Sequence, residues 1–146
     1  MPMFDTIPTP RKIVQDPGLV LILGEYDNTF RQVFTDGRKL PEDFVPSWLG
    51  SSVGRWEGDT LVVETAGTNG RSLLDTRGHT HSDQLRITER FRRLQFGKME
   101  VQLTLDDPQT FSRPAVVKFN WVLMPDTDLF ESFCTENERD ATHAVK

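Results

Sequence analysis

"LRITERFRRLQFGKMEVQLTLDD", residues 85–107, contains two successive runs in which apolar and polar side chains alternate. Successive side chains of a β-strand point to opposite faces, so alternation with period two predicts a strand with one buried face. The predicted buried faces hold Leu85, Ile87, Glu89 and Phe91 in the first run, and Met99, Val101, Leu103 and Leu105 in the second.

Strand patterns continue on both sides of this stretch. Residues 19–24 (LVLILG) are a continuous apolar run, as expected for a strand buried on both faces, and residues 29–35 (TFRQVFT) alternate. Residues 51–65 (SSVGRWEGDTLVVET) predict a hairpin with EGD at its tip. Further strands are expected at 116–124 and 128–134, and residues 39–50, with two prolines and a glycine, are expected to form a long loop.

These segments predict an all-β fold of about eight strands. We expect a closed antiparallel eight-stranded up-and-down barrel on a lipocalin-like plan, because closure removes the exposed edges that invite aggregation. A two-sheet sandwich is the alternative, followed by an NTF2-like cone, which would require helices. We expect an extended N-terminal arm over 1–18 with one short strand at 11–15, a barrel domain over 19–136, and a flexible tail over 137–146.

Composition and charge restrict the partners. The 146 residues carry a formal net charge of −5, which disfavours nucleic acid. The single cysteine, Cys134, excludes an internal disulfide framework and a multi-cysteine zinc site. The sequence has no apolar run long enough to span a bilayer and no signal peptide at its start, so we expect a soluble chain with no membrane partner. As written, the chain is expected to be cytoplasmic; if an upstream signal sequence is missing, it is expected to be periplasmic or secreted. An edge strand could pair in a homodimer.

Three longer blocks carry a resemblance to known sequences: GRWEGDTLVVET (54–65), LLDTRGHTHSDQLRITERFRR (73–93) and LTLDDPQTFSRP (103–114). Together they resemble a family of uncharacterised bacterial proteins, and YDNTFRQVFTDGR (26–38) is similar to the family's upstream block. The chain departs from the family pattern at Thr80, where the pattern has proline. The resemblance implies a set of candidate residues and no reaction, because the family has no established activity.

His81 is the first candidate for catalysis. Histidine titrates near neutral pH and can therefore act as both base and acid. His81 lies where a polar loop meets a strand, at the expected barrel mouth, and Asp75 or Asp83 could orient its ring. The alternative is a loop histidine that braces the turn by bonding to backbone. We expect no metal or cofactor. A weaker alternative is that His79 and His81 together bind a divalent metal ion such as zinc.

Glu89 interrupts an apolar face between Ile87 and Phe91, and a buried carboxylate must be paired or neutral. It could assist His81 in catalysis, or form a structural ion pair with Arg31 or, through a bend, with Arg90. Arg31 itself could clamp an anion or be a surface charge. The other candidates for substrate binding, which could equally be core, turn or ion-pair residues, are Tyr26, Trp48, Trp56, Trp121 and Glu131.

Three functions remain open from the sequence. The first is a small β-barrel enzyme that binds a small, mostly apolar organic substrate and uses histidine for proton-transfer chemistry, as a lyase, isomerase, cyclase or hydrolase. The second is a barrel that binds a small molecule without turnover. The third is a structural or interaction domain. Neither a dinucleotide fingerprint nor a phosphate-binding loop is present, so we expect no nicotinamide, flavin or nucleotide.

Overall fold

A computed structural model describes residues 9–131, which fold as one sheet of eight strands with a single 3-10 turn. All-β architecture and the number of strands agree with the sequence prediction. The elements are β1 (Arg11–Asp16), β2 (Leu19–Gly24), η1 (Tyr26–Asn28), β3 (Thr29–Phe34), β4 (Ser51–Glu57), β5 (Thr60–Ala66), β6 (Arg86–Gln95), β7 (Lys98–Asp106) and β8 (Ala115–Val122).

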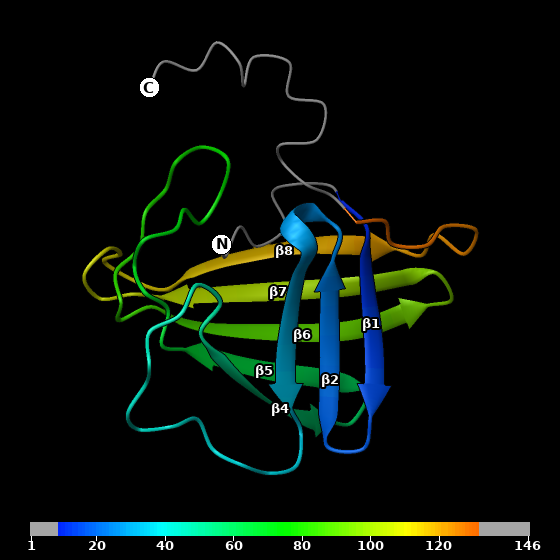
Figure 1. The fold of residues 1–146 in the computed structure, drawn as a ribbon, viewed down its shortest axis with the longest axis horizontal. Coiled ribbons are helices and arrows are strands. Elements are labelled where there is room, and N and C mark those ends of the chain that lie inside the picture. Colours follow the sequence, from blue (N-terminus) through cyan, green and yellow to red (C-terminus); the bar gives the residue numbers. More distant parts are fainter. Residues whose placement is uncertain (1–8, 132–146) are drawn as a thin grey trace.

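The strands lie in the sheet in chain order, and every neighbouring pair is antiparallel except β3 and β4. The connection 35–50 returns the chain so that β4 starts in the same direction as β3, and only two residue pairs join them, Val33 with Ser52 and Phe34 with Val53. The sheet curls, and β1–β3 cross in front of β4–β8 (Figure 1).

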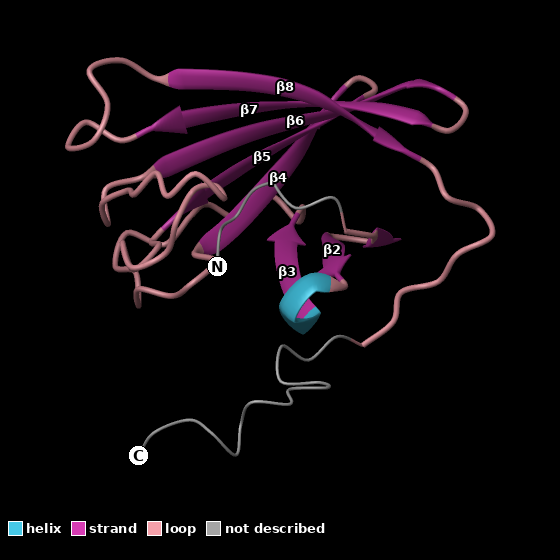
Figure 2. Ribbon diagram, turned by 90° about the horizontal axis from the view of Figure 1, so that it is seen from above, coloured by secondary structure: helices cyan, strands magenta, loops and turns pink. Residues whose placement is uncertain are grey.

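The predicted closed up-and-down barrel is wrong, because the sheet is an open half-barrel (Figure 2). One parallel step reverses the sense of every later strand, so β1 and β8 point the same way and could close only as a parallel pair, which is less stable per residue. They meet through side chains instead: the Arg11 guanidinium lies 5.4 Å from the centre of the Trp121 ring. The sandwich alternative is also wrong, since all eight strands form one continuous sheet.

Two individual strands differ from the prediction. Residues 128–131 form no strand, and the rest of the predicted strand 128–134 lies outside the described residues. The short strand predicted at 11–15 is confirmed as β1, and it supplies the eighth strand of the sheet. In β2 only Val20 and Ile22 are buried, while Leu21 and Leu23 are half-buried. In β2 only the concave face is buried, whereas β5, in the middle of the sheet order, is buried on both faces.

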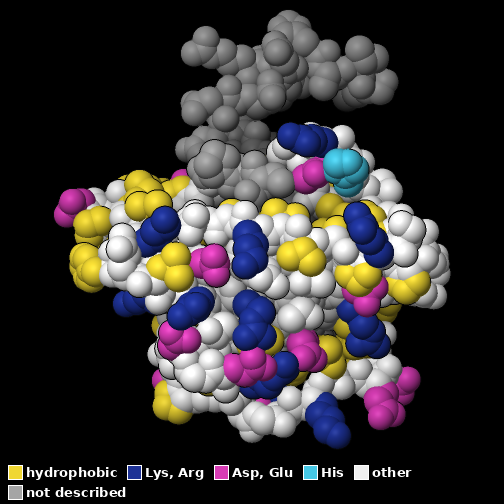
Figure 3. Space-filling model, turned by 180° about the vertical axis from the view of Figure 1, so that it is seen from behind, with side chains coloured by type: hydrophobic (Ala, Val, Ile, Leu, Met, Phe, Trp, Pro, Cys, Tyr) yellow, Lys and Arg dark blue, Asp and Glu magenta, His cyan; other side chains and the backbone are white. Residues whose placement is uncertain are grey.

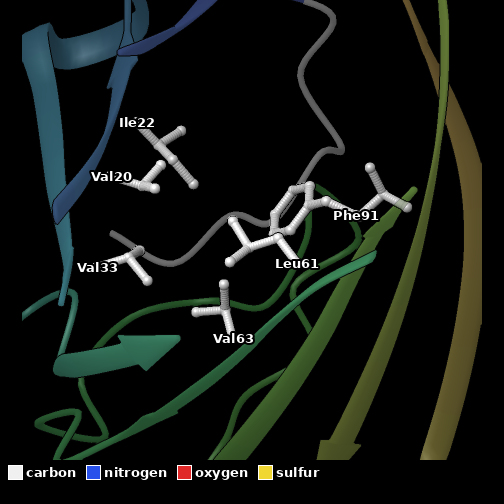
Figure 4. Packing of buried hydrophobic residues seen from close by; sticks show 7 residues of the cluster. Val20, Ile22, Val33, Leu61, Val63 and Phe91 are labelled. Atoms are coloured by element: carbon white, nitrogen blue, oxygen red, sulfur yellow. The ribbon is translucent and has the colours of Figure 1, made fainter. Parts of the chain in front are cut away.

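The core fills the concave face in two clusters. In the first, Val20, Ile22 and Val33 of β2 and β3 point toward Leu61, Val63 and Phe91 of β5 and β6 (Figure 4). The second lies toward the loop end of the sheet and contains Leu74, Leu85, Ile87, Leu103 and Leu105. Among residues 9–131, no helix has the length and apolar character needed to cross a bilayer.

Candidate functional site

His81 is buried, with 5% of the residue exposed, and both of its ring nitrogens have partners within the protein. Nδ1 lies 2.8 Å from the backbone carbonyl oxygen of Ser82 and Nε2 lies 2.8 Å from the hydroxyl oxygen of Ser72. A carbonyl oxygen only accepts hydrogen bonds, so Nδ1 carries the hydrogen and donates it. The ring therefore ties residues 72 and 82 together and presents no unbonded nitrogen to a substrate.

Asp107 holds the other side of this loop. Its carboxylate accepts from the Ser82 backbone N–H at 2.6 Å and the Ser82 hydroxyl at 2.7 Å. It also accepts from the Gln109 N–H at 3.1 Å and the Thr110 hydroxyl at 2.8 Å. Burial acts to raise the pKa of Asp107, but these hydrogen bonds to the charged form outweigh it and hold the pKa below its ordinary value. We call Ser72, His81, Ser82 and Asp107 the loop brace.

Asp75 and Asp83, the two acids expected to orient His81, lie elsewhere. Asp75 bonds to His79, with 2.6 Å between Oδ2 and Nδ1, and accepts from the backbone N–H groups of Arg77 and His79. The hydrogen bond from His79 is the main cause that lowers the pKa of Asp75. Asp83 is exposed. The acid linked to His81 is Asp107, which accepts hydrogen bonds from Ser82, the residue whose carbonyl the His81 ring contacts. Asp107 was not among the candidate residues predicted from the sequence.

The two histidines do not form a metal site. The His79 ring is exposed and bonded to Asp75, whereas the His81 ring is buried and bonded on both sides. Within residues 9–131, no three His, Cys, Asp or Glu side chains are grouped so that they could hold a metal ion. Cys134 lies outside the described residues. The donor set therefore does not fit the zinc alternative for His79 and His81.

Glu89 and Arg31 form the ion pair that the sequence suggested as one alternative. Arg31 Nη2 donates to Glu89 Oε2 and, at 2.7 Å, to the Thr65 hydroxyl; Nε donates to the Ser52 hydroxyl at 3.0 Å. The Arg31 and Glu89 side chains are only 11% and 6% exposed, so Arg31 is not a surface charge. Glu89 pairs across the sheet with Val63 and Leu103, which belong to different core clusters. The ion pair therefore lies where the two clusters meet.

The aromatic candidates do not converge on one pocket. Trp48 and Trp56 are exposed, and Tyr26 is half-buried in η1. Trp121 packs against Phe91, with ring centres 5.5 Å apart. Glu131 is exposed and lies beyond β8, outside any strand.

A groove of about 440 Å³ lies at the loop end of the sheet, next to the loop brace. The connection 35–50 forms one wall: Ser47 N–H donates to the Gly67 carbonyl at 3.1 Å, and Asn69 N–H donates to the Ser47 carbonyl at 2.9 Å. Phe44 packs directly on Gly67, where an added Cβ would lie 2.5 Å from the ring. The lining residues are Phe44, Ala66, Gly67, Asp83, Gln84, Leu85, Arg86, Asp106 and Pro108.

The convex face carries mixed charge. Basic and acidic side chains alternate over it (Figure 3). Arg90 bonds to Glu57 at 2.8 Å, Arg92 to Asp59 at 3.4 Å and Arg55 to Glu64 at 2.5 Å. β6 carries four arginines, Arg86, Arg90, Arg92 and Arg93, and two of them, Arg90 and Arg92, are thus paired with acids, as is typical of a solvated surface rather than an anion site.

Fold and site together define a class: an all-β domain with an open, curled sheet and one braced groove at its loop end. Comparison with known proteins found no matching family model, no matching curated protein and no matching solved structure.

Proposed function

We propose that this chain is a non-catalytic binding domain whose groove takes a small organic cation with an apolar body. The observation that carries the proposal is the lining of the groove. Phe44 and Pro108 supply apolar surface, and the buried Ala66 and Leu85 lie behind it. The lining also includes two carboxylates, Asp83 and Asp106, and one guanidinium, Arg86, so its formal charge is negative. A volume of about 440 Å³ lies within the range of small-molecule sites.

The loop brace supports this proposal because it connects the two sides of the groove. Asp83 and Gln84 follow Ser82 directly, while Asp106 and Pro108 flank Asp107. The hydrogen bonds between Ser82 and Asp107 therefore fix the distance between the two sides of the groove, residues 83–84 and residues 106–108. A site held in shape before binding loses less conformational entropy when the ligand arrives.

The binding proposal has more support than the catalytic one. Proton transfer by His81 would require its ring to give up the bond to Ser72 or to Ser82. Glu89 is engaged by Arg31 in the core. The catalytic alternative stays a prediction, and its test is loss of turnover in a folded His81→Ala variant.

The binding proposal is tested by an NMR titration of the amide resonances with phenethylamine. Phenylacetate, which has the same ring and the opposite charge, is the matched probe. We expect phenethylamine to shift the amides of Ala66, Gly67 and Leu85 with a Kd of about 1 mM, typical of a ligand with so few atoms. Phenylacetate should shift them much less.

Variants separate the groove from general surface binding. Asp83→Asn combined with Asp106→Asn should weaken phenethylamine binding at least several-fold, because the carboxylates are removed while the shape is kept. Asp126→Asn, an exposed acid beyond β8, is the control and should leave binding unchanged. Equal shifts with both probes, or equal loss in both variants, would overturn the proposal.

A further inference from the structure

β8 is an edge strand whose outer side has no partner in the described part of the chain. It pairs with β7 over eight residues without a bulge. Beyond the strand, the described backbone adds one bond, from Leu123 N–H to the Gly97 carbonyl at 2.9 Å. An edge strand of this length presents a row of free backbone donors and acceptors that can pair with another chain.

The two edges of the sheet differ in their protection. β1 lies between Pro10 and Pro17, and three of its six residues, Arg11, Lys12 and Asp16, are charged. Prolines and charged side chains disfavour pairing of an edge strand with another chain. β8 carries one charged residue, Lys118, among eight. Three of its valines are strongly exposed: Val116 at 58%, Val117 at 47% and Val122 at 73%. β1 also exposes Ile13 at 38% and Val14 at 41%, but the most exposed valines of the two edge strands lie on β8, the less protected edge.

We propose that β8 pairs antiparallel with β8 of a second copy of this chain, centred on Phe119, so that two half-barrels share one continuous sheet. The alternation of faces limits the possible registers. In β8, Val117, Phe119 and Trp121 point to the concave face, where they lie beside Leu103, Val101 and Met99 of β7. Val116, Lys118, Asn120 and Val122 point to the convex face. Opposite residues in a continuous sheet must share a face, so the twofold axis passes through a residue and not between two.

Charge then selects between the two registers with the greatest overlap. An axis through Lys118 would place Lys118 of each copy directly opposite the other, which is unfavourable. An axis through Phe119 places Lys118 opposite Asn120, Val116 opposite Val122, and Val117 opposite Trp121. That register has apolar partners for both exposed valines of the convex face and no like charges opposite each other.

A pair of double variants tests this register. Val116→Lys with Val122→Lys places lysine opposite lysine at both ends of the interface. Val116→Glu with Val122→Lys places glutamate opposite lysine at the same positions. Both remove the same two exposed valines, and the two positions are about 20 Å apart along one strand, so they do not affect each other in the monomer. Circular dichroism checks that both variants fold.

Sedimentation equilibrium measures the outcome. We expect the wild type to reach twice its monomer mass of 16.7 kDa as concentration rises. The lysine–lysine variant should dimerise at least about tenfold more weakly than the glutamate–lysine variant, whose dimer should weaken in high salt. A wild type that stays monomeric at every concentration reached would overturn the proposal. So would equal dimerisation of the two folded variants, which would place the interface elsewhere.

Discussion

At the scale of single residues, Asp107 and Ser82 join two loops that are far apart in the chain. Asp107 is fully buried and its carboxylate accepts four hydrogen bonds, two of them from Ser82. Replacing it with asparagine keeps the size but turns one acceptor oxygen into a donor that faces other donors. We expect Asp107→Asn to lower the free energy of unfolding by about 2–3 kcal/mol at neutral pH, measured by urea denaturation.

The same residue has a predictable pH dependence. Its pKa in the folded protein is below the ordinary value of 3.8, so its contribution to stability is fully present above that value and is lost as the pH falls through the folded pKa. The difference in unfolding free energy between wild type and Asp107→Asn should therefore shrink between neutral pH and about pH 3. A constant difference over this range would show that the charge of Asp107 does not stabilise the fold.

The Arg31–Glu89 pair leads to a second prediction at this scale. Removing one partner leaves a buried charge uncompensated, so Glu89→Leu or Arg31→Met alone should each cost about 3–5 kcal/mol. The double variant Arg31→Met, Glu89→Leu should cost less than either single change, because no charge remains. Ser52 and Thr65 keep a partner in it, since their hydroxyls lie 2.8 Å apart. A double-mutant cycle by chemical denaturation measures this, and additive costs would contradict it.

At the scale of elements, the connection 35–50 shapes the groove through one close contact. Gly67 has φ of 78°, and a Cβ there would meet the Phe44 ring. Gly58, in the β4–β5 turn, has φ of 61° and no atom within 4 Å of an added Cβ. Alanine at Gly58 should therefore cost only the backbone strain, about 1 kcal/mol.

Alanine at Gly67 carries the same strain and must also displace Phe44. We expect Gly67→Ala to lower the melting temperature more than Gly58→Ala, and to weaken phenethylamine binding, which Gly58→Ala should leave unchanged. Similar behaviour of the two variants would mean that the position of Phe44 does not shape the groove.

At the scale of the whole molecule, the weakest join lies between β3 and β4. Two residue pairs connect these strands, whereas six or more connect every other neighbouring pair. The join is reinforced by Arg31, which reaches from β3 to β4, β5 and β6, and by the first core cluster.

We expect native-state hydrogen exchange to show β1–β3 opening at a lower free energy than β5–β7. The Glu89→Gln change should widen that gap, because it weakens the tie across the join. Uniform protection over all eight strands would show instead that the sheet opens as one cooperative unit.

The candidate site could be predicted only in part. Because Glu89 interrupts an apolar face, the alternating pattern alone predicted that it needs a charged partner. Arg31 is that partner in the structure. The partners of His81 could not be read in the same way. Ser72 lies nine positions before it, and Asp107, which acts through Ser82, lies on another loop. Only the Asp-Pro-Gln-Thr run, typical of a side chain that bonds to its own turn, pointed toward Asp107.

The sequence by itself determined the all-β class and the positions of the eight strands, because strand patterns and turn residues act over a few neighbours. It also determined which side chains share the concave face in β6 and β7. The tertiary structure alone decided the parallel step between β3 and β4, the open edge at β8 and the partners of His81. These depend on the direction in which the connection 35–50 returns and on contacts between distant loops, which no local pattern of residues encodes.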